Sequence, residues 1–212
     1  MKRLKKIRIP QETIRRLALY LRSLKKLNKQ NLTIVSSSQI TNHINVTSDQ
    51  FRKDLSYVGS LGKRGVGYNV ELLVNHLEKV LGVNTECRII LAVGGKRGSA
   101  LRAYPGFLNF NFRIVAAFDN DPSKIGKVQE GIRIEDISKM RGIISRFGVN
   151  LAILAVPAES ARAVAKKLAD CGIRGILNFA PVSLGLSQKV YVLDVDMATE
   201  LMALTYFSRK VL

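Results

Sequence analysis

Residues 88–100 read RIILAVGGKRGSA, an apolar run that leads directly into a glycine-rich turn. The apolar run has the length of a β-strand, and the turn opens a stretch that we expect to be helical, Ser99–Tyr104. A strand that ends in such a turn and opens a helix is a recurring unit of parallel α/β sheets. This stretch therefore predicts an α/β domain around it.

After this stretch, apolar runs of strand length alternate with helical stretches as far as residue 195. Runs that are apolar throughout indicate strands buried on both faces, and their alternation with helices indicates right-handed βαβ units. We predict an α/β fold, a Rossmann-like doubly wound parallel sheet, over residues 83–195. The expected strands are Ile89–Val93, Ile114–Phe118, Leu151–Val156, Gly175–Phe179 and Val190–Val195, and the further expected helices are Asp136–Phe147 and Ser160–Cys171.

The glycine-rich turn indicates a dinucleotide site, because backbone N–H groups at the start of a helix can approach a pyrophosphate. Asp119 ends the second strand 21 residues after Gly98 (119 minus 98). That spacing is typical of a carboxylate that hydrogen-bonds the adenosine ribose. A carboxylate there disfavours a 2′-phosphate, so we expect NAD(H) rather than NADP(H). The alternative is an ordinary turn role for Asp119, because DNDPS at residues 119–123 is rich in turn formers.

The turn departs from the G-x-G-x-x-G pattern of dinucleotide sites. When its last two glycines are aligned on that pattern, a β-branched valine stands at the first glycine, and Gly94 is expected to take over the tight turn. The two cations of the turn would pair with phosphates. The strand ends at residues 156–158 and 178–181 are expected at the same crevice, although ordinary strand-to-helix turns explain these residues equally well. The cofactor-binding residues predicted in this way are Val93, Gly94, Gly95, Lys96, Arg97, Gly98, Asp119, Val156, Pro157, Ala158, Asn178, Phe179 and Pro181.

The first 82 residues carry a helical pattern instead. A helix is expected to begin at Pro10, with one apolar and one basic side. Ser36 and Gln39 have the spacing of a capping box for a short helix ending near Ile44, and Thr47 or Ser48 can cap a third helix. The first helix has apolar residues Ile14, Leu17, Ala18, Leu21, Leu24 and Leu27, and basic residues Arg15, Arg22, Lys25, Lys26 and Lys29.

The second and third of these helices fit a helix-turn-helix. The third runs to about Val58 and turns Phe51, Leu55 and Val58 inward, which leaves basic and polar residues facing outward. Such a helix can enter the major groove of double-stranded DNA. The alternative is a small helical bundle with a solvated basic face.

A glycine-rich segment, GSLGKRGVGY at residues 59–68, follows the third helix. A tight hairpin here would place two cations at its tip, as in a wing that enters a narrow minor groove. An ordinary surface turn is the alternative. Asn69 is then expected to cap a linking helix. We predict a winged-helix domain over residues 1–82 whose DNA-binding residues are Ser48, Gln50, Arg52, Lys53, Ser56, Tyr57, Lys63, Arg64 and Gly65.

The charge of the chain favours a polyanionic partner. The 212 residues include 34 Lys and Arg against 16 Asp and Glu, a formal net charge of +18. The first 80 residues hold 16 of the basic side chains and five of the acidic ones, so the net charge is concentrated there. Because 47% of the residues are hydrophobic, the chain is not a disordered basic tail. We therefore expect a folded protein that binds nucleic acid.

Several other classes are disfavoured. Two cysteines, Cys87 and Cys171, and two histidines, His43 and His76, form neither a disulfide framework nor a zinc pattern, so we expect no metal and a reducing, cytoplasmic setting. No apolar run approaches the ~18–20 residues of a membrane span, and the first ten residues lack the apolar stretch of a signal peptide. No acid–base catalyst stands out in the α/β domain, so we expect no enzyme.

The last segment, residues 196–212, is expected to be a helix with apolar residues around more than one face. One sheet cannot cover all of them, so a second subunit is expected to do so. A two-fold homodimer would also place two recognition helices on the two half-sites of a palindromic operator. We therefore predict a homodimer that is held together through this segment.

Together these features resemble the redox-sensing transcriptional repressor Rex family, over nearly the whole chain. The strings that carry the resemblance are long and specific. They are Arg52–Tyr57 (RKDLSY) with Gly59, Leu61–Tyr68 (LGKRGVGY), Tyr104–Phe107 (YPGF), Phe118-Asp119 with Lys124–Gly126 (KIG), Val156–Ala158 (VPA) and Gly175–Pro181 (GILNFAP).

The resemblance implies a winged-helix domain, a Rossmann domain and a carboxy-terminal helix that is swapped between the subunits of a dimer. It implies that NADH and NAD+ compete for one site and that NADH binding releases the operator. It adds Lys124, Tyr104 and Asp196 to the cofactor-binding residues. Tyr104 and Asp196 would distinguish the two states, with Arg22 as another partner for Asp196. From the residues alone, two alternatives remain: an NAD- or CoA-dependent enzyme of Rossmann type, and a DNA-binding protein whose Rossmann domain only dimerises.

Overall fold

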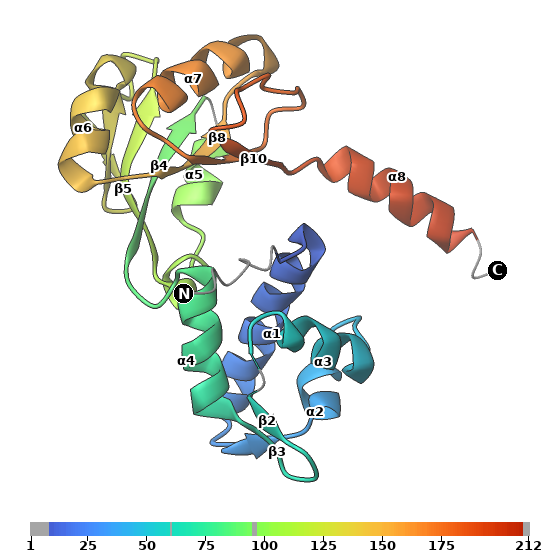
Figure 1. The fold of residues 1–212 in the computed structure, drawn as a ribbon. Coiled ribbons are helices and arrows are strands. Elements are labelled where there is room, and N and C mark those ends of the chain that lie inside the picture. Colours follow the sequence, from blue (N-terminus) through green and yellow to red (C-terminus); the bar gives the residue numbers. More distant parts are fainter. Residues whose placement is uncertain (1–8, 60, 95–96, 210–212) are drawn as a thin grey trace, which may run out of the picture. The chain divides into compact units, whose positions relative to one another are not determined.

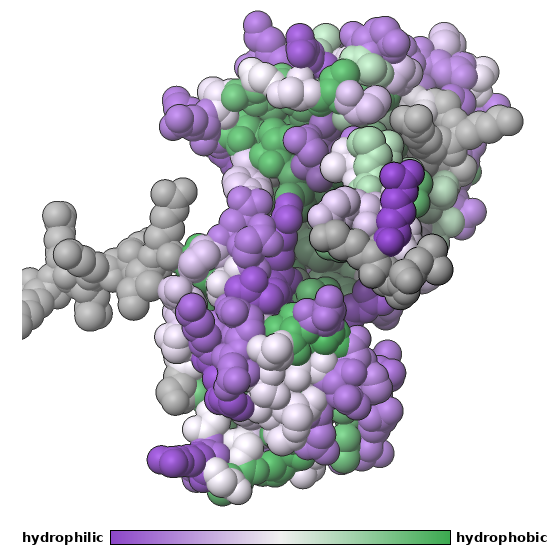
Figure 2. Space-filling model, turned by 90° about the vertical axis from the view of Figure 1, so that its right-hand side faces the viewer, coloured by the Kyte–Doolittle hydropathy of each residue, from purple (hydrophilic) through white to green (hydrophobic). Residues whose placement is uncertain are grey.

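The chain forms two units, Met1–Thr85 and Glu86–Leu212, each with its own core (Figure 1). The computed structural model describes residues 9–59, 61–94 and 97–209. The face seen in Figure 2 carries hydrophilic residues over much of both units, as expected of a strongly charged chain.

The first unit is a winged-helix domain, as predicted. It combines helices with a small antiparallel sheet in which β3 lies between β1 and β2. The hairpin of β2 and β3 is the wing, and α2 and α3 are the helix-turn-helix. In chain order the elements are α1 (Gln11–Lys29), β1 (Ile34–Val35), α2 (Ser37–Thr41), α3 (Ser48–Ser56), β2 (Gly62–Lys63), β3 (Gly67–Asn69) and α4 (Val70–Leu81).

Three side chains begin the helices of this unit as the sequence predicts. Ser36 accepts a hydrogen bond from the backbone of Gln39, whose side chain bonds back to the Ser36 N–H, so the capping box is complete. Thr47, not Ser48, caps α3, and Asn69 caps α4. Each cap satisfies a backbone N–H that the helix leaves free. The start of the candidate recognition helix is therefore fixed locally.

The buried face of α1 differs from the prediction. Ile14 is 37% exposed and Ala18 is exposed, whereas Tyr20 is fully buried. The Tyr20 ring meets Phe51 of α3 edge to face at 4.8 Å, and Phe51 meets Tyr68 of β3 in the same way at 5.2 Å. This aromatic stack joins α1, α3 and the wing. The side of α1 that carries Tyr20 is therefore buried, and the side that carries Ile14 and Ala18 is exposed.

The second unit is a doubly wound α/β sheet, which confirms the predicted Rossmann-like fold. The seven strands lie in the order β10-β9-β8-β4-β5-β7-β6, all parallel except β6. Numbered along the chain, the parallel strands have the order 3-2-1-4-5-6, that of dinucleotide-binding sheets. The strands are β4 (Cys87–Val93), β5 (Phe112–Asp119), β6 (Val128–Gln129), β7 (Ile132–Asp136), β8 (Leu151–Ala155), β9 (Gly175–Asn178) and β10 (Tyr191–Asp194).

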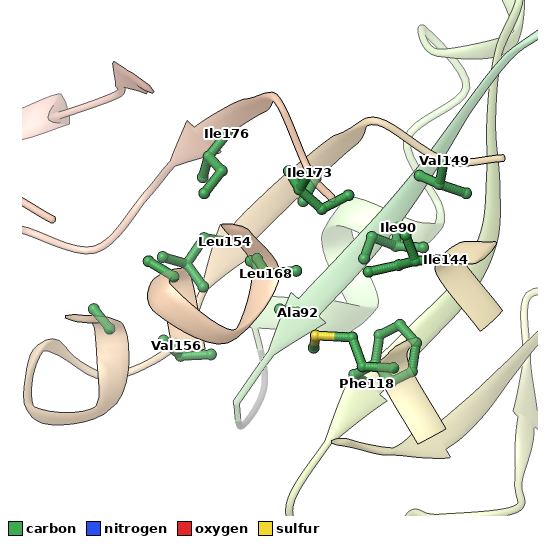
Figure 3. Packing of buried hydrophobic residues seen from close by; sticks show 14 of the residues in the cluster. Ile90, Ala92, Phe118, Ile144, Val149, Leu154, Val156, Leu168, Ile173 and Ile176 are labelled. Carbon is green, nitrogen blue, oxygen red and sulfur yellow. The ribbon is translucent and has the colours of Figure 1, made fainter. Parts of the chain in front are cut away.

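Helices cover both faces of this sheet. On one face, Ile144 and Leu168 from two helices lie among strand side chains such as Ile90 and Leu154 (Figure 3). On the other face, Leu91 and its neighbours pack with Leu101. Burial on both faces explains why these strands are apolar throughout. The helical elements are α5 (Arg97–Arg102), the 3-10 helices η1 (Leu108–Phe110) and η2 (Ile137–Lys139), α6 (Met140–Phe147) and α7 (Ala158–Asp170).

The prediction of one helix over Asp136–Phe147 was wrong at its start. Asp136 is the last residue of β7, and its side chain accepts a hydrogen bond from the Ser138 N–H at 2.7 Å, which begins η2 before α6. β6 was missed because it is only two residues long, and β7 was missed because charged residues alternate with its apolar ones (IRIED). Neither strand has the continuous apolar run that marks a strand buried on both faces.

The last helix, α8 (Met197–Ser208), is apolar and exposed on all sides. None of its residues is buried, and Met197, Leu201, Met202 and Phe207 are each more than 60% exposed. Asp196 caps this helix, where its side chain accepts hydrogen bonds from Ala198 and Thr199. The pattern agrees with a segment that another surface covers.

Candidate DNA-binding and nucleotide-binding sites

A groove of about 790 Å³ runs between the recognition helix α3 and the wing. It brings together five of the predicted DNA-binding residues: Arg52, Ser56, Lys63, Arg64 and Gly65. The four that do not line it are Ser48, Gln50, Lys53 and Tyr57, all on or next to α3. The side chains of Arg52, Lys53, Lys63 and Arg64 are exposed. Residues that the sequence predicts separately, from a helix and from a glycine-rich segment, therefore form one basic surface.

The guanidinium of Arg52 is held in place in this groove. Its Nη1 donates a hydrogen bond to the Ser37 hydroxyl at 2.8 Å, and its Nη2 donates to the Asp49 carboxylate. Ser37 belongs to α2 and Asp49 to the first turn of α3, so the contacts link both helices of the helix-turn-helix. The two terminal nitrogens keep further N–H groups for another ligand, because a guanidinium has five.

A buried carboxylate, Asp54, joins α3 to α1. Arg16 donates to both of its oxygens, at 2.6 and 2.8 Å, and Tyr20 donates at 2.7 Å. Thr13 and Gln50 complete the cluster at 3.1 and 2.9 Å. The sequence pattern does not predict this cluster, and the Gln50 amide, which was predicted to contact DNA, donates to Asp54. An Asp beside Arg and Lys in an amphipathic helix gives no sequence signal of burial.

The electrostatics of Asp54 follow from these bonds. Burial by itself raises the pKa of the Asp54 carboxyl, but hydrogen bonds, led by that from Arg16, outweigh burial and lower it from 3.8 to about 2. The hydrogen bond to Asp54 raises the pKa of Arg16, and burial together with Asp54 raises the pKa of Tyr20. Asp54 is therefore charged at neutral pH, and the orientation of α3 depends on a charged, fully bonded group.

The wing owes its shape to glycine. Gly65 at the tip has φ +77° and Gly67 has φ +108°, a region that residues with a Cβ rarely adopt. A Cβ on Gly67 would lie 2.6 Å from the carbonyl oxygen of Val35 in the neighbouring strand. The hairpin therefore closes tightly, with Lys63 and Arg64 at its tip. His76 of α4 contacts the carbonyl oxygen of Val58 at 2.7 Å, which anchors the chain between α3 and the wing.

In the second unit, a cavity of about 340 Å³ lies where three strands end. Val93 ends β4 and Gly94 follows it, Asp119 ends β5, and Val156 and Pro157 follow β8. The strand order reverses between β4 and β8, so this is the crevice where doubly wound sheets bind ligands. A Cβ on Gly94 would lie 2.9 Å from the Pro157 ring, so glycine permits the close approach of the two strand ends.

Asp119 is 4% exposed at the wall of this cavity and is part of an ionic cluster. Lys124 donates to it at 3.1 Å and to Asp121 at 3.2 Å, and the Asp121 backbone N–H donates to Asp119 at 3.1 Å. The hydrogen bond to Asp119 raises the pKa of Lys124. The carboxylate retains lone pairs that can accept from a ligand, because each oxygen has two.

Among the residues whose side chains the structure describes, Tyr104, Ala158, Asn178, Phe179, Pro181 and Asp196 do not line this cavity. Gly95 and Lys96 lie outside the described residues, and Arg97 and Gly98 are described only as the start of α5. The Asn178 side chain is 1% exposed and bonds to Asp194 and to the backbone of the loop after β9. Ala158 begins α7, Phe179 and Pro181 lie in the loop after β9, and Asp196 caps α8.

Tyr104 lies elsewhere in the second unit. It is 54% exposed and stacks edge to face on Phe107 at 5.0 Å. It lines a separate hollow of about 730 Å³ together with Phe112 and Arg113, which begin β5. Because Asp119 is at the other end of β5, this structure does not bring Tyr104 to the cavity beside Asp119.

No helix in residues 9–59, 61–94 and 97–209 is both long enough and apolar enough to span a bilayer. The two sites belong to a chain in which a winged-helix unit with a basic groove is joined to a Rossmann unit with a cavity at its switch point. These features define a class of two-domain proteins that combine a DNA-binding fold with a nucleotide-binding fold.

Comparison with known proteins agrees with this class. The family described as "Putative DNA-binding protein N-terminus" matches residues 8–56, and the family described as "CoA binding domain" matches residues 84–182. The redox-sensing transcriptional repressor Rex of Carboxydothermus hydrogenoformans is 44% identical over 207 residues, 98% of this chain and 100% of the relative. That of Chloroflexus aggregans is 42% identical over 198 residues, 93% of each chain. This chain belongs to the redox-sensing transcriptional repressor Rex family.

Solved structures agree with the assignment. The chain is similar to RSP, a Rex-family repressor, in its complex with beta-NAD+ and operator DNA, with a TM-score of 0.86 and 30% identity over 99% of this chain and 94% of that one. The complex of RSP with beta-NADH gives a TM-score of 0.83 at 30% identity over 95% of each chain. The resemblance inferred from the sequence is thereby confirmed.

Proposed function

We propose that this chain is a DNA-binding transcriptional repressor that senses the NADH/NAD+ ratio and releases its operator when NADH binds. One observation carries the proposal: a single chain holds both a basic groove between a recognition helix and a wing, and a cavity at the switch point of a Rossmann sheet. The chain is similar to Rex repressors along nearly their whole length. The relative RSP has been solved with operator DNA and beta-NAD+ and with beta-NADH.

In the first unit, α3 enters the major groove and the wing follows the adjacent minor groove. Arg52 has the donors that guanine O6 and N7 require, and Lys53 and Ser56 are exposed on the same helix. Lys63 and Arg64 at the wing tip suit the negative potential of a narrow minor groove. Asp54 holds α3 against α1, so the helix approaches DNA in one orientation.

In the second unit, the dinucleotide binds across the carboxyl ends of β4, β5 and β8. Asp119 accepts a hydrogen bond from the adenosine ribose, and the hydrogen bond from Lys124 orients its carboxylate. A carboxylate at this position repels a 2′-phosphate, which favours NAD(H) over NADP(H). The pyrophosphate is expected at the start of α5, since a helix N-terminus favours phosphate groups.

The chain works as a homodimer, and α8 supplies part of the interface. Its apolar residues are exposed on every side, so a second subunit is the surface that covers them. We infer that α8 is exchanged between subunits and that NADH favours the dimer in which the recognition helices no longer fit their half-sites. A difference of a few kcal/mol between the two states suffices, since each ~1.4 kcal/mol is a factor of ten.

The test is the binding of full-length protein to a selected DNA duplex, followed by fluorescence anisotropy with NADH or NAD+ added. We expect NADH to weaken binding and NAD+ to leave it intact. The Asp119→Ala variant should keep DNA binding and lose the response to NADH. If neither nucleotide changes DNA affinity, the sensor is refuted and a DNA-binding protein whose Rossmann domain only dimerises is favoured.

We also infer that the chain binds the dinucleotide without transforming it. Its relatives are named repressors, and both histidines belong to the first unit. In the described part of the cavity, the titratable side chains of Asp119, Asp121 and Lys124 are bonded to one another. Oxidation of NADH by the protein in the presence of small 2-oxo acids, followed at the absorbance of NADH, would contradict this inference.

A further inference from the structure

The recognition helix presents a carboxylate to the surface that the proposed function assigns to DNA. Asp49 lies in the first turn of α3, and its side chain is 90% exposed. It accepts a hydrogen bond from Arg52 three residues later, and Arg52 lines the basic groove. An exposed carboxylate next to DNA phosphates is repelled by them, so its presence weakens binding to DNA in general.

The helix dipole explains only part of this arrangement. An acidic residue in the first turn stabilises a helix, and Glu12 does so in α1, where it pairs with Arg15 in the same i, i+3 relation. Asp49 differs because its partner is also bonded to Ser37 of the preceding helix. Arg52 is thus held from two sides by residues of two helices.

The pair of contacts leaves Arg52 ready to read a base. Ser37 takes one N–H of Nη1 and Asp49 takes one N–H of Nη2, so each terminal nitrogen keeps another, and Nε keeps its own. A guanidinium with two free N–H groups on neighbouring nitrogens matches guanine O6 and N7. Because its rotation is restricted, Arg52 cannot turn as freely toward a phosphate.

We propose that Asp49 is a specificity-determining residue: it positions the Arg52 guanidinium to read a guanine and lowers affinity for DNA that lacks that guanine. The proposal rests on the proposed function in that α3 must enter the major groove. Asp49 acts through Arg52 and is in that sense a positioning residue. Removing its charge should therefore strengthen binding to random DNA and weaken discrimination between operators.

The experiment uses the full chain and a duplex library with a randomised centre. Wild type is used to select bound sequences, and anisotropy then compares the selected duplex with one in which a selected G·C pair is replaced by A·T. The variants are Asp49→Asn, Ser37→Ala and Arg52→Ala, with Glu12→Gln as the control, because it removes a similar first-turn charge from α1. Thermal unfolding of each variant checks the fold.

We expect Asp49→Asn to reduce the discrimination ratio about tenfold, which is within the range expected for one bidentate base contact. The reduction should fall on the base pair that Arg52→Ala also affects, and Ser37→Ala should give a smaller reduction there. Glu12→Gln should leave the ratio unchanged.

The outcomes separate the two proposals. If wild type selects a sequence and Asp49→Asn keeps the same ratio, Asp49 only stabilises the helix and the inference is overturned, while the proposed function stands. The same holds if Asp49→Asn and Arg52→Ala affect different base pairs. If wild type selects no sequence, the proposed function fails, and the inference fails with it.

Discussion

Replacing Asp54 by Asn should destabilise the winged-helix unit far more than any exposed carboxylate can. The substitution keeps the size of the side chain and one acceptor oxygen but removes the charge that Arg16 and Tyr20 bond. Arg16 is then left with a neutral partner while it remains partly buried, with 26% of its side chain exposed. A cation that loses its buried counter-charge is costly, at ~3–5 kcal/mol in the least favourable cases.

The magnitude follows from the pKa of Asp54. Its fall from 3.8 to about 2 means that the folded unit prefers the charged carboxylate. At ~1.36 kcal/mol per pH unit, that preference is ~2–3 kcal/mol, and Asp54→Asn should cost roughly this amount. For a unit of this size each kcal/mol lowers the melting temperature by ~4–8 °C, so we expect a fall of about 10–20 °C.

The assay is calorimetric unfolding of the full chain, in which the first unit and the second can give separate transitions. The transition of the first unit should shift, and that of the second should stay in place. Glu12→Gln is the matched control, because Glu12 pairs with Arg15 while both are more than half exposed, and such pairs contribute ~0–1 kcal/mol. If Asp54→Asn shifts the transition no more than Glu12→Gln does, the cluster does not hold α3 and our reasoning is refuted.

Four further outcomes are expected. Because the pKa of Asp54 is lowered in the folded state, its stabilisation of the first unit is complete above about pH 4. In wild type this stabilisation should be lost between about pH 4 and pH 2, whereas Asp54→Asn should show no such loss, and unfolding measured at each pH checks this. Lys63→Ala and Arg64→Ala should each weaken binding to all duplexes alike. Each should also reduce the slope of log affinity against log salt concentration by about 0.9 for every phosphate that is no longer neutralised, as measured by anisotropy at several salt concentrations. Asn178→Ala should destabilise the second unit by ~2–3 kcal/mol in urea, since it leaves the Ala180 N–H and the buried end of β9 without a partner. Leu201→Glu on α8 should convert the dimer to monomers in sedimentation, and an unchanged dimer would remove α8 from the interface.

The sequence predicted those parts of the fold that depend on local or strongly periodic signals. The three caps depend on one side chain and a backbone group three residues away, so Ser36, Thr47 and Asn69 could be read directly. The central strands are buried on both faces and are therefore apolar without interruption. Neither β6 nor β7 carries such a signal, because β6 at the edge has only two residues and β7 beside it has exposed charged residues such as Arg133.

The sites could be predicted only in part, for a physical reason. The glycines and cations of the wing are adjacent in sequence, so their function follows from composition. Asp54 and Arg16 are 38 residues apart, and only the packing of α3 on α1 reveals that they meet. Asn178 stands at a strand end, where both a ligand contact and a structural role fit the pattern. The structure shows that its side chain is bonded within the protein.

The acidic residues of the first unit organise its basic surface. Among its described carboxylates, Glu12, Asp49, Asp54 and Glu78 each contact a cation, and they differ in where that cation lies. Asp54 and Glu78 bind Arg16 and Lys25 between helices, which withdraws these two charges from the surface. Asp49 binds a cation that remains in the groove. A net charge of +18 attracts any polyanion, but charge alone does not select a DNA sequence or fix the orientation of the protein on DNA. The few carboxylates fix which cations reach DNA and in which direction they point. The sequence selectivity of this unit for DNA therefore depends on its acidic residues.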